Sequence, residues 1–159
     1  MRYLFATGGT AGHINPALAV ASYIRDTYPD SKILFVGTAD HMESRLVPNA
    51  GFDFKTIEIN GFKRSFSPKA VAANVKTVFK LLKSEQASKN IIKEFNPDVV
   101  IGFGGYVSGP VLEEAAKMHI PCCIHEQNAF PGITNKQLAK KVDKVMLTVE
   151  DAAKHLQPK

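Results

Sequence analysis

Two glycine-rich segments of the chain and one polar segment could together bind an anionic ligand. They cover residues 7–13, 102–110 and 125–132. Glycine lets the backbone turn tightly and approach a ligand closely. Where a helix follows, its first N–H groups point at the ligand and favour a negative charge. The first segment, which runs Thr-Gly-Gly-Thr-Ala-Gly-His, is therefore predicted to bind a phosphorylated ligand.

The glycine pattern departs from both familiar nucleotide-binding loops. Residues 8–12 lack the G-x-G-x-x-G spacing of a dinucleotide fingerprint, and they lack the Gly-Lys-Ser/Thr ending of a triphosphatase loop. An oxidoreductase with a nucleotide cofactor also needs an acidic residue at the end of the second strand to hold a ribose. Here that strand ends in Val36, Gly37 and Thr38, which disfavours this class of enzyme.

Alternating strand and helix patterns place the three segments at one edge of a sheet. Short β-branched runs predict strands at 3–6, 32–36, 54–59, 98–101, 122–125 and 144–148. Longer runs predict helices at 16–28, 41–50, 68–94, 111–118 and 134–141. This alternation predicts an α/β fold with a Rossmann-like, doubly wound parallel sheet. In such sheets ligands bind beyond the carboxyl ends of the strands, which is where all three segments fall.

Several predicted boundaries have a local cause. Pro16 suits the first turn of a helix, where its missing N–H would have no partner in any case. Gly51 follows the second helix, where a left-handed residue is expected. Asn96 and Pro97 are expected to stop the third helix before the fourth strand.

The length and composition of the chain indicate one domain. The chain has 159 residues, of which 45% are hydrophobic, and this length suffices for a buried core. It shows neither a secretory signal nor an apolar run of about 18 residues, so no membrane-spanning segment is expected. Cys122 and Cys123 are adjacent, which makes a disulfide between them awkward and predicts reduced thiols in the cytoplasm. The net charge of +5 favours anionic partners.

In order and position, the three segments resemble the motifs of the MurG family of peptidoglycan N-acetylglucosaminyltransferases. Residues 8–19 are similar to the family's opening motif, 102–110 to its second glycine loop and 125–136 to its third motif. The resemblance covers essentially the whole chain. Ala11 departs from it, because the family more often has glycine there. This difference should stiffen the loop slightly without blocking its N–H groups.

The resemblance implies a two-domain glycosyltransferase architecture of the GT-B type. The family's first domain takes the acceptor undecaprenyl-diphosphoryl-MurNAc-pentapeptide (lipid I), and its second carries most of the UDP-GlcNAc pocket. Residues 1–159 are similar to the N-terminal acceptor domain only, so the donor domain is expected to be absent and this part alone to be inactive. The implied reaction moves GlcNAc to the C4 hydroxyl of MurNAc with inversion. The chain would then be a truncated piece or a natural half.

Other functions fit some of the same features. A membrane-recruiting subunit of a split glycosyltransferase would also stop after the acceptor domain. A sister enzyme that glycosylates diacylglycerol would share the fold, but it fits the three motifs less closely.

The resemblance assigns roles to residues of all three segments. His13 is the first candidate for the base that removes the acceptor's hydroxyl proton, because it ends the phosphate loop and titrates near neutrality. Equally, His13 could only bind the diphosphate or cap the helix. Glu126 is the reserve base. The groups expected to bind the acceptor diphosphate are Gly9, Thr10, Ala11, Gly12, Gly104, Gly105 and Tyr106.

Polar side chains of the third segment are candidates for contacts with the sugars. Asn128 and Asn135 are expected to contact acceptor or donor, although Asn135 could instead be a helix-start residue that ties the segment down. Tyr106 could be simple packing, and His125 could orient Glu126. No cofactor, metal ion or nucleic acid is expected. Three histidines without such a context are expected at the surface: His41, His119 and His155.

A lysine-rich amphipathic stretch could contact a membrane. Its apolar residues recur at helical spacing beside lysines, a pattern that suits the anionic inner leaflet. The same pattern also suits an ordinary helix with its stripe in the core. Because the resembling family works on a lipid substrate, we expect peripheral contact with the cytoplasmic face of the bacterial membrane. The residues expected to face it are Phe62, Phe66, Lys69, Val75, Lys76, Phe79 and Lys80.

Overall fold

The structure is a computed structural model that describes residues 1–59 and 68–158, with side chains left out of the description over 68–80. The residues expected to face a membrane lie outside this description. Two of them fall in the segment that is left out, and for the others the side chains are left out. They are Phe62 and Phe66, and the side chains of Lys69, Val75, Lys76, Phe79 and Lys80.

Six parallel strands form one sheet in the order β3-β2-β1-β4-β5-β6. They are β1 (Arg2–Ala6), β2 (Lys32–Gly37), β3 (Asp53–Thr56), β4 (Val99–Gly102), β5 (Cys122–Glu126) and β6 (Lys144–Leu147). All of the pairings are parallel, with Leu4, for example, opposite both Leu34 and Val100. The predicted doubly wound, Rossmann-like sheet is confirmed.

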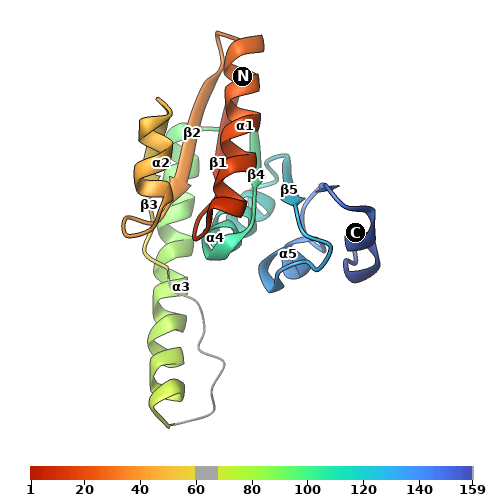
Figure 1. Cartoon of the computed structure of the whole chain (residues 1–159). Helices are drawn as coiled ribbons and strands as arrows, with labels where there is room; N and C mark the ends of the chain where they lie inside the picture. Colours follow the sequence, from red (N-terminus) through yellow and green to blue (C-terminus); the bar gives the residue numbers. More distant parts are fainter. Residues whose placement is uncertain (60–67, 159) are drawn as a thin grey trace.

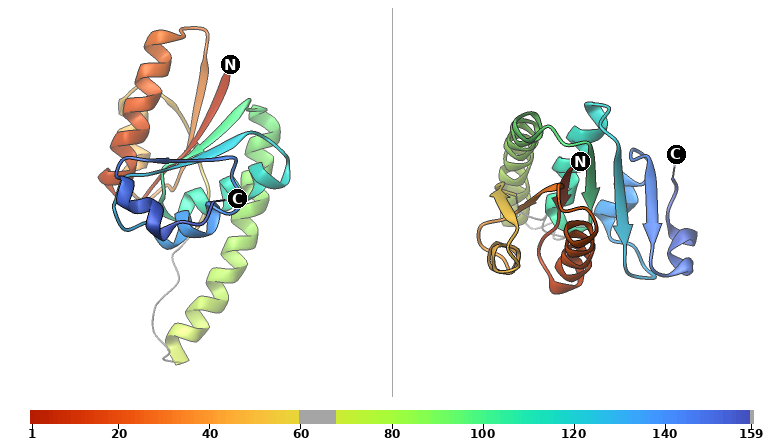
Figure 2. Two further views of the ribbon diagram at one scale, coloured as in Figure 1. Left: turned by 90° about the vertical axis from the view of Figure 1, so that its right-hand side faces the viewer. Right: turned by 90° about the horizontal axis from the view of Figure 1, so that it is seen from above.

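Helices cover both faces of this sheet. They are α1 (Ala11–Thr27), α2 (Glu43–Asn49), α3 (Pro68–Phe95), α4 (Gly105–Lys117) and α5 (Ile133–Leu138), followed by a 3-10 helix, η1 (Glu150–His155). Seen from above, α1 and α2 lie on one side of the sheet and α3 and α4 on the other (Figure 2). This split follows from right-handed crossovers, which run from β1 to β3 in one direction along the sheet and from β3 to β6 in the other.

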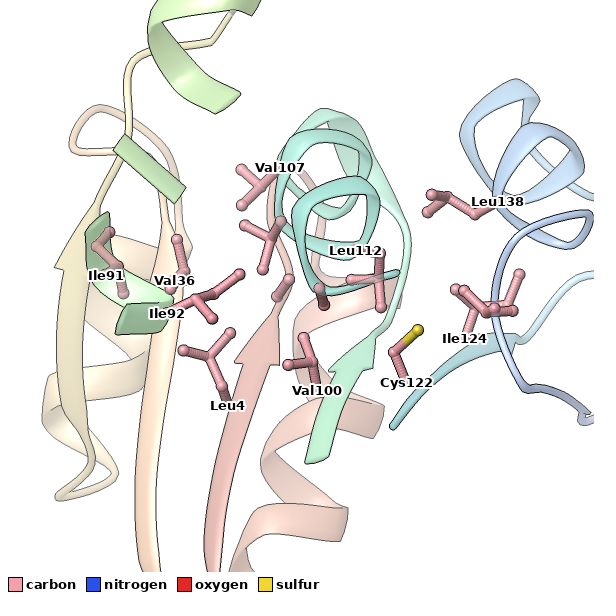
Figure 3. Packing of buried hydrophobic residues seen from close by; sticks show 14 of the residues in the cluster. Leu4, Val36, Ile91, Ile92, Val100, Val107, Leu112, Cys122, Ile124 and Leu138 are labelled. Carbon is pink, nitrogen blue, oxygen red and sulfur yellow. The ribbon is translucent and has the colours of Figure 1, made fainter. Parts of the chain in front are cut away.

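Two apolar clusters, one on each face, hold the layers together. Along β1, Leu4 and Ala6 belong to one cluster and Phe5 to the other, as the alternation of a strand requires. Figure 3 shows the first cluster, in which Leu4 and Val100 of the sheet face Ile92 of α3 and Leu112 of α4. In the second, the Phe5 ring stacks on Phe35 and Phe103 with centroids 4.9 and 5.7 Å apart.

Two helices begin earlier than the sequence predicted. α1 starts at Ala11 instead of Pro16, and α4 starts at Gly105 instead of Val111. The prediction assigned the glycines to loops and placed Pro16 in the first turn of its helix. However, Pro16 and Pro110 each stand at the sixth helical residue, so the bond that each removes would have ended on a carbonyl of the first turn. The first and second glycine segments therefore run directly into the N-termini of helices.

The remaining local predictions are mostly confirmed. Gly51 adopts a φ of +80° just after α2, and Asn96 adopts +47° where α3 ends. β3 is shorter than expected and ends at Thr56. Cys122 belongs to the first apolar cluster and Cys123 packs against the second, so the two thiols, both within the described chain, face opposite sides of the sheet without a disulfide.

None of the helices within the described residues is both long enough and apolar enough to cross a membrane.

Candidate functional site

The first and second loops lie at the topological switch point of the sheet. β1 and β4 are neighbours at its centre, and the chain leaves them toward opposite faces, through α1 and α4. Ligands of open parallel sheets bind at the carboxyl edge beside such a divergence. We call residues 7–13 the first loop, 102–110 the second loop and 125–132 the third loop.

The first and second loops touch through glycines. Gly105 has a φ of +78°, and a Cβ there would collide with the carbonyl oxygen of Gly8. A Cβ on Gly104 would lie 2.9 Å from the ring of His13. Ser108 is buried and donates a hydrogen bond to the carbonyls of Ala6, at 3.0 Å, and Gly104, at 2.8 Å. The close approach explains why these positions carry no side chain.

His13 is half-buried in the first turn of α1 and faces both loops. Its Nδ1 lies 3.2 Å from the carbonyl oxygen of Gly8 and 3.2 Å from Oγ1 of Thr10. Its Nε2 edge points to Gly104, where an added Cβ would be 3.0 Å away. His13 therefore stands where the two loops meet, with one ring nitrogen bonded to the protein and the other beside bare backbone.

The third loop is organised by Glu126, whose residue is only 1% exposed. Its Oε1 accepts the N–H of Asn128 at 2.9 Å and the side-chain amide of Asn128 at 3.1 Å. Its Oε2 accepts the amide of Asn135 at 2.9 Å and the N–H of Gly132 at 3.3 Å. The carboxylate thus ties the loop to α5 from within and has little surface of its own toward solvent.

His125 precedes this carboxylate on β5. Its Nε2 lies 2.9 Å from Oγ1 of Thr148, and its ring lies 5.3 Å from that of Phe103. Burial lowers the pKa of His125, and the neighbouring charge of Glu126 opposes that shift only in part. The imidazole is thereby biased toward its neutral form.

A second buried carboxylate, Glu43, was missed by the sequence analysis. It begins α2, is fully buried, and accepts the N–H of Gly9 at 3.1 Å through Oε2. Its Oε1 accepts the N–H and the hydroxyl of Thr38, at 3.0 and 2.7 Å. The N–H of Gly9, expected among the anion-binding groups, is thus engaged. The N–H groups of Ala11 and Gly12, at the start of α1, have no partner within the helix.

The sequence carried one usable signal for Glu43. Gly37 closes a strand, and a Cβ there would lie 2.5 Å from Cγ of Glu43, so this glycine marks a close approach. No spacing rule could link Glu43 to Gly9, because the two residues are 34 positions apart.

Buried polar atoms without a hydrogen-bond partner gather at the same edge of the sheet. Within the described residues there are four, and all belong to the first loop, the third loop or α5: Thr7 Oγ1, His125 Nδ1, Gln127 Oε1 and Asn135 Oδ1. Buried polar groups are normally satisfied, so a cluster of exceptions is typical of a functional site.

The predicted binding residues differ in accessibility. Gly9, Thr10, Gly12, Tyr106 and Asn128 are exposed, Ala11 and Gly105 are half-buried, and Gly104 and Asn135 are buried. The structure brings the first and second loops into contact and links Asn135 to Asn128 through Glu126. His41, His119 and His155 are exposed, as expected. No cluster of three or more metal-ligand side chains occurs in the described part of the chain.

Two hollows in the described part of the chain lie apart from the three loops. One, of about 740 Å³, lies at the ends of β2 and β3 and is lined by Thr38, Asp40 and Lys83 among others. A hydrogen bond with His41 lowers the pKa of Asp40 there. The other, of about 690 Å³, lies between α5 and η1 and is lined by four lysines, Lys136, Lys140, Lys141 and Lys154, together with His155. Residues of the three loops line neither hollow.

The chain matches known proteins along its length. Residues 3–147 match the family model described as the glycosyltransferase family 28 N-terminal domain. Over 97% of its length it is 53% identical to the UDP-N-acetylglucosamine–N-acetylmuramyl-(pentapeptide) pyrophosphoryl-undecaprenol N-acetylglucosamine transferase of Clostridioides difficile. It is 50% identical, over its whole length, to the protein of the same name from Acetivibrio thermocellus.

A solved structure agrees with these relatives. The crystal structure of Acinetobacter baumannii MurG superimposes with a TM-score of 0.81 and 31% identity over 99% of the chain. The chain spans 37% and 42% of the two relatives and 43% of the crystallised protein, so each of them is more than twice as long.

Proposed function

The chain belongs to the glycosyltransferase family 28 N-terminal domain family, and we propose that it is the acceptor-binding part of a peptidoglycan N-acetylglucosaminyltransferase. The whole enzyme would transfer GlcNAc from UDP-GlcNAc to the C4 hydroxyl of MurNAc in undecaprenyl-diphosphoryl-MurNAc-pentapeptide. The names of the relatives state this donor and this acceptor. UDP-GlcNAc would be held mainly by a C-terminal donor domain.

The observation that carries this proposal is the meeting of the loops at the switch point. The first turns of α1 and α4 both start there, and each offers N–H groups with no partner in its helix. Two helix N-termini side by side suit a doubly charged diphosphate better than a single phosphate. The unpaired buried polar atoms of the third loop lie at the same edge and are candidates for sugar contacts.

His13 and Glu126 take different roles in this proposal. A base must accept the proton of the attacking hydroxyl while the bond between GlcNAc and UDP breaks and UDP leaves with the bonding electrons. His13 offers a ring nitrogen beside the phosphate loop. Glu126 is 1% exposed and its two oxygens already accept four hydrogen bonds, so it positions the third loop.

Binding of a soluble lipid I analogue to the chain tests the site. A Cβ on Gly12 would meet nothing nearer than Oγ1 of Thr10 at 3.7 Å, so Gly12→Val leaves the fold intact and obstructs the ligand. We expect at least tenfold weaker binding. Ala19→Val, which adds similar bulk to an exposed position farther along α1, is the matched control. Equal binding by Gly12→Val and wild type would overturn the site assignment.

Turnover of the whole enzyme tests the base. His13→Asn should lower kcat by a factor of about 10² to 10⁴ while acceptor affinity stays the same. Near-normal turnover with normal affinity would rule out the base role of His13.

We also propose peripheral contact with the anionic, cytoplasmic face of the bacterial membrane. The support is the lysine-flanked apolar pattern of 62–83 and a lipid-linked acceptor in the names of the relatives. Co-sedimentation with vesicles should then be stronger for anionic than for neutral lipid, by about 1 kcal/mol for each nearby cation. Equal co-sedimentation would contradict the contact.

A further inference from the structure

Glu43 lies directly beneath the first loop, and its carboxylate is packed against the loop backbone. A Cβ on Gly8 would be 2.6 Å from Oε1 of Glu43, and a Cβ on Gly37 would be 2.5 Å from its Cγ. The three donors that meet the carboxylate come from the backbone of Gly9 and from Thr38. Only the ionised form accepts at both oxygens without presenting a proton of its own, so Glu43 is a buried negative charge.

One peptide group connects this charge to His13. The N–H of Gly9 donates to Oε2 of Glu43 at 3.1 Å. The carbonyl of the same peptide group belongs to Gly8, and its oxygen lies 3.2 Å from Nδ1 of His13. A carbonyl oxygen only accepts, so in this contact Nδ1 carries the hydrogen and Nε2 holds the lone pair.

We propose that Glu43 is a positioning residue for His13 and acts through the Gly8–Gly9 peptide group. The carboxylate polarises that peptide group, which makes the Gly8 oxygen a stronger acceptor for Nδ1–H. The stronger bond selects one tautomer and orients the ring. The inference rests on the proposed function, in which Nε2 takes the proton of the acceptor hydroxyl. Nδ1 keeps its own hydrogen throughout, and Glu43 remains ionised.

The other elements around His13 present backbone and a neutral amide. The second loop faces the ring with Gly104, and its titratable Tyr106 is 59% exposed to solvent. The side-chain amide of Asn135, from α5, lies on the far side of Gly104 and donates to Glu126. Glu126 has no peptide link to the ring, so its influence is through space.

Thr10 offers the competing arrangement. Its Oγ1 is also 3.2 Å from Nδ1, and a hydroxyl that donates to Nδ1 would place the hydrogen on Nε2. In that tautomer His13 would donate a hydrogen bond to a phosphate and could not act as a base. The two tautomers thus separate the two roles that the sequence left open.

Nitrogen NMR of the imidazole rings in the chain distinguishes them, with the His13 signals assigned from a His13→Asn variant. We expect the neutral ring of His13 to carry its hydrogen on Nδ1. In Glu43→Gln, a larger share of the neutral ring should carry its hydrogen on Nε2. The matched control is Glu114→Gln, which removes another buried carboxylate that pairs with Lys117 instead.

Each outcome decides the inference. An Nε2–H tautomer in the wild-type chain overturns it, and this holds even where Glu43→Gln does not fold. Equal tautomer populations in wild type and Glu43→Gln also overturn it, as does the same change in Glu114→Gln. Because the measurement needs no acceptor, failure of the proposed function would appear separately, as a chain with the expected tautomer that does not bind the lipid I analogue.

Discussion

The first and third loops each combine a histidine with a buried glutamate, but the two glutamates reach their loops in different ways. Glu126 belongs to the loop that it holds, and its donors lie two to nine residues away. Glu43 comes from α2, 34 residues after the Gly9 that it binds. The third loop is therefore braced from within, whereas the first is braced by a different part of the fold.

The difference indicates which elements stabilise the conformation of each loop. The third loop can hold its conformation as soon as β5 and α5 are packed, since its partners are local. The first loop depends on β1, β2 and α2 together, because Gly37 and Thr38 of β2 and its following turn complete the pocket around Glu43. Damage to α2 should reach the phosphate site, and damage to α5 should not.

Removal of the carboxylate of Glu43 or Glu126 should have the largest effect on the free energy of unfolding. Glu43→Ala leaves three donors around a fully buried position, so it should lower the free energy of unfolding by about 3 to 5 kcal/mol. Glu126→Ala should cost less, about 1 to 3 kcal/mol, because Asn128 and Gly132 are exposed and water can replace part of its contacts. Urea unfolding of the two variants measures the comparison, and equal losses would contradict it.

A methyl group added to a glycine of the first or third loop should have an intermediate effect on the free energy of unfolding. Gly8→Ala would push a Cβ against Glu43 and Val107, at 2.6 and 3.2 Å, and should cost about 1 to 3 kcal/mol. Gly132→Ala in the third loop meets nothing within 4 Å, and at a φ of −65° it should be neutral or stabilise by less than about 1 kcal/mol. The same unfolding assay applies. A destabilised Gly132→Ala would show that the third loop is as tightly packed as the first.

The smallest effect is the pH dependence of the third loop. Burial lowers the pKa of His125 in the folded chain, so the unfolded chain binds that proton first as the pH falls. Stability should then decrease as the pH drops below the ordinary histidine value of about 6.5, until the folded chain is protonated too. His125→Gln should lose less stability between pH 7 and pH 5 than wild type does. An identical loss in both proteins would contradict this assignment.

Features with a local cause could be predicted from the sequence. The parallel, doubly wound sheet and the position of the three segments at its carboxyl edge followed from the alternation of strands and helices, and Glu126 stood in a recognisable motif. The starts of α1 and α4 could not be placed, because Gly12 and Pro16 look like breakers until the helix is seen to tolerate a proline at its sixth residue. Glu43 was missed because an acid at a helix start usually lies at the surface, where it complements the helix dipole.

The length of α3 fixes a distance in the molecule. α3 has 28 residues, which corresponds to a rod of about 42 Å, and Figure 1 shows it continuing well past the carboxyl edge that carries the loops. A helix of this length can act as a spacer, since it fixes the distance between its own N-terminal end and the carboxyl edge of the sheet. Each residue inserted into it would increase that distance by about 1.5 Å and turn that end by about 100°. In the proposed membrane contact, the number of residues in α3 would set the height of the loops above the lipid surface.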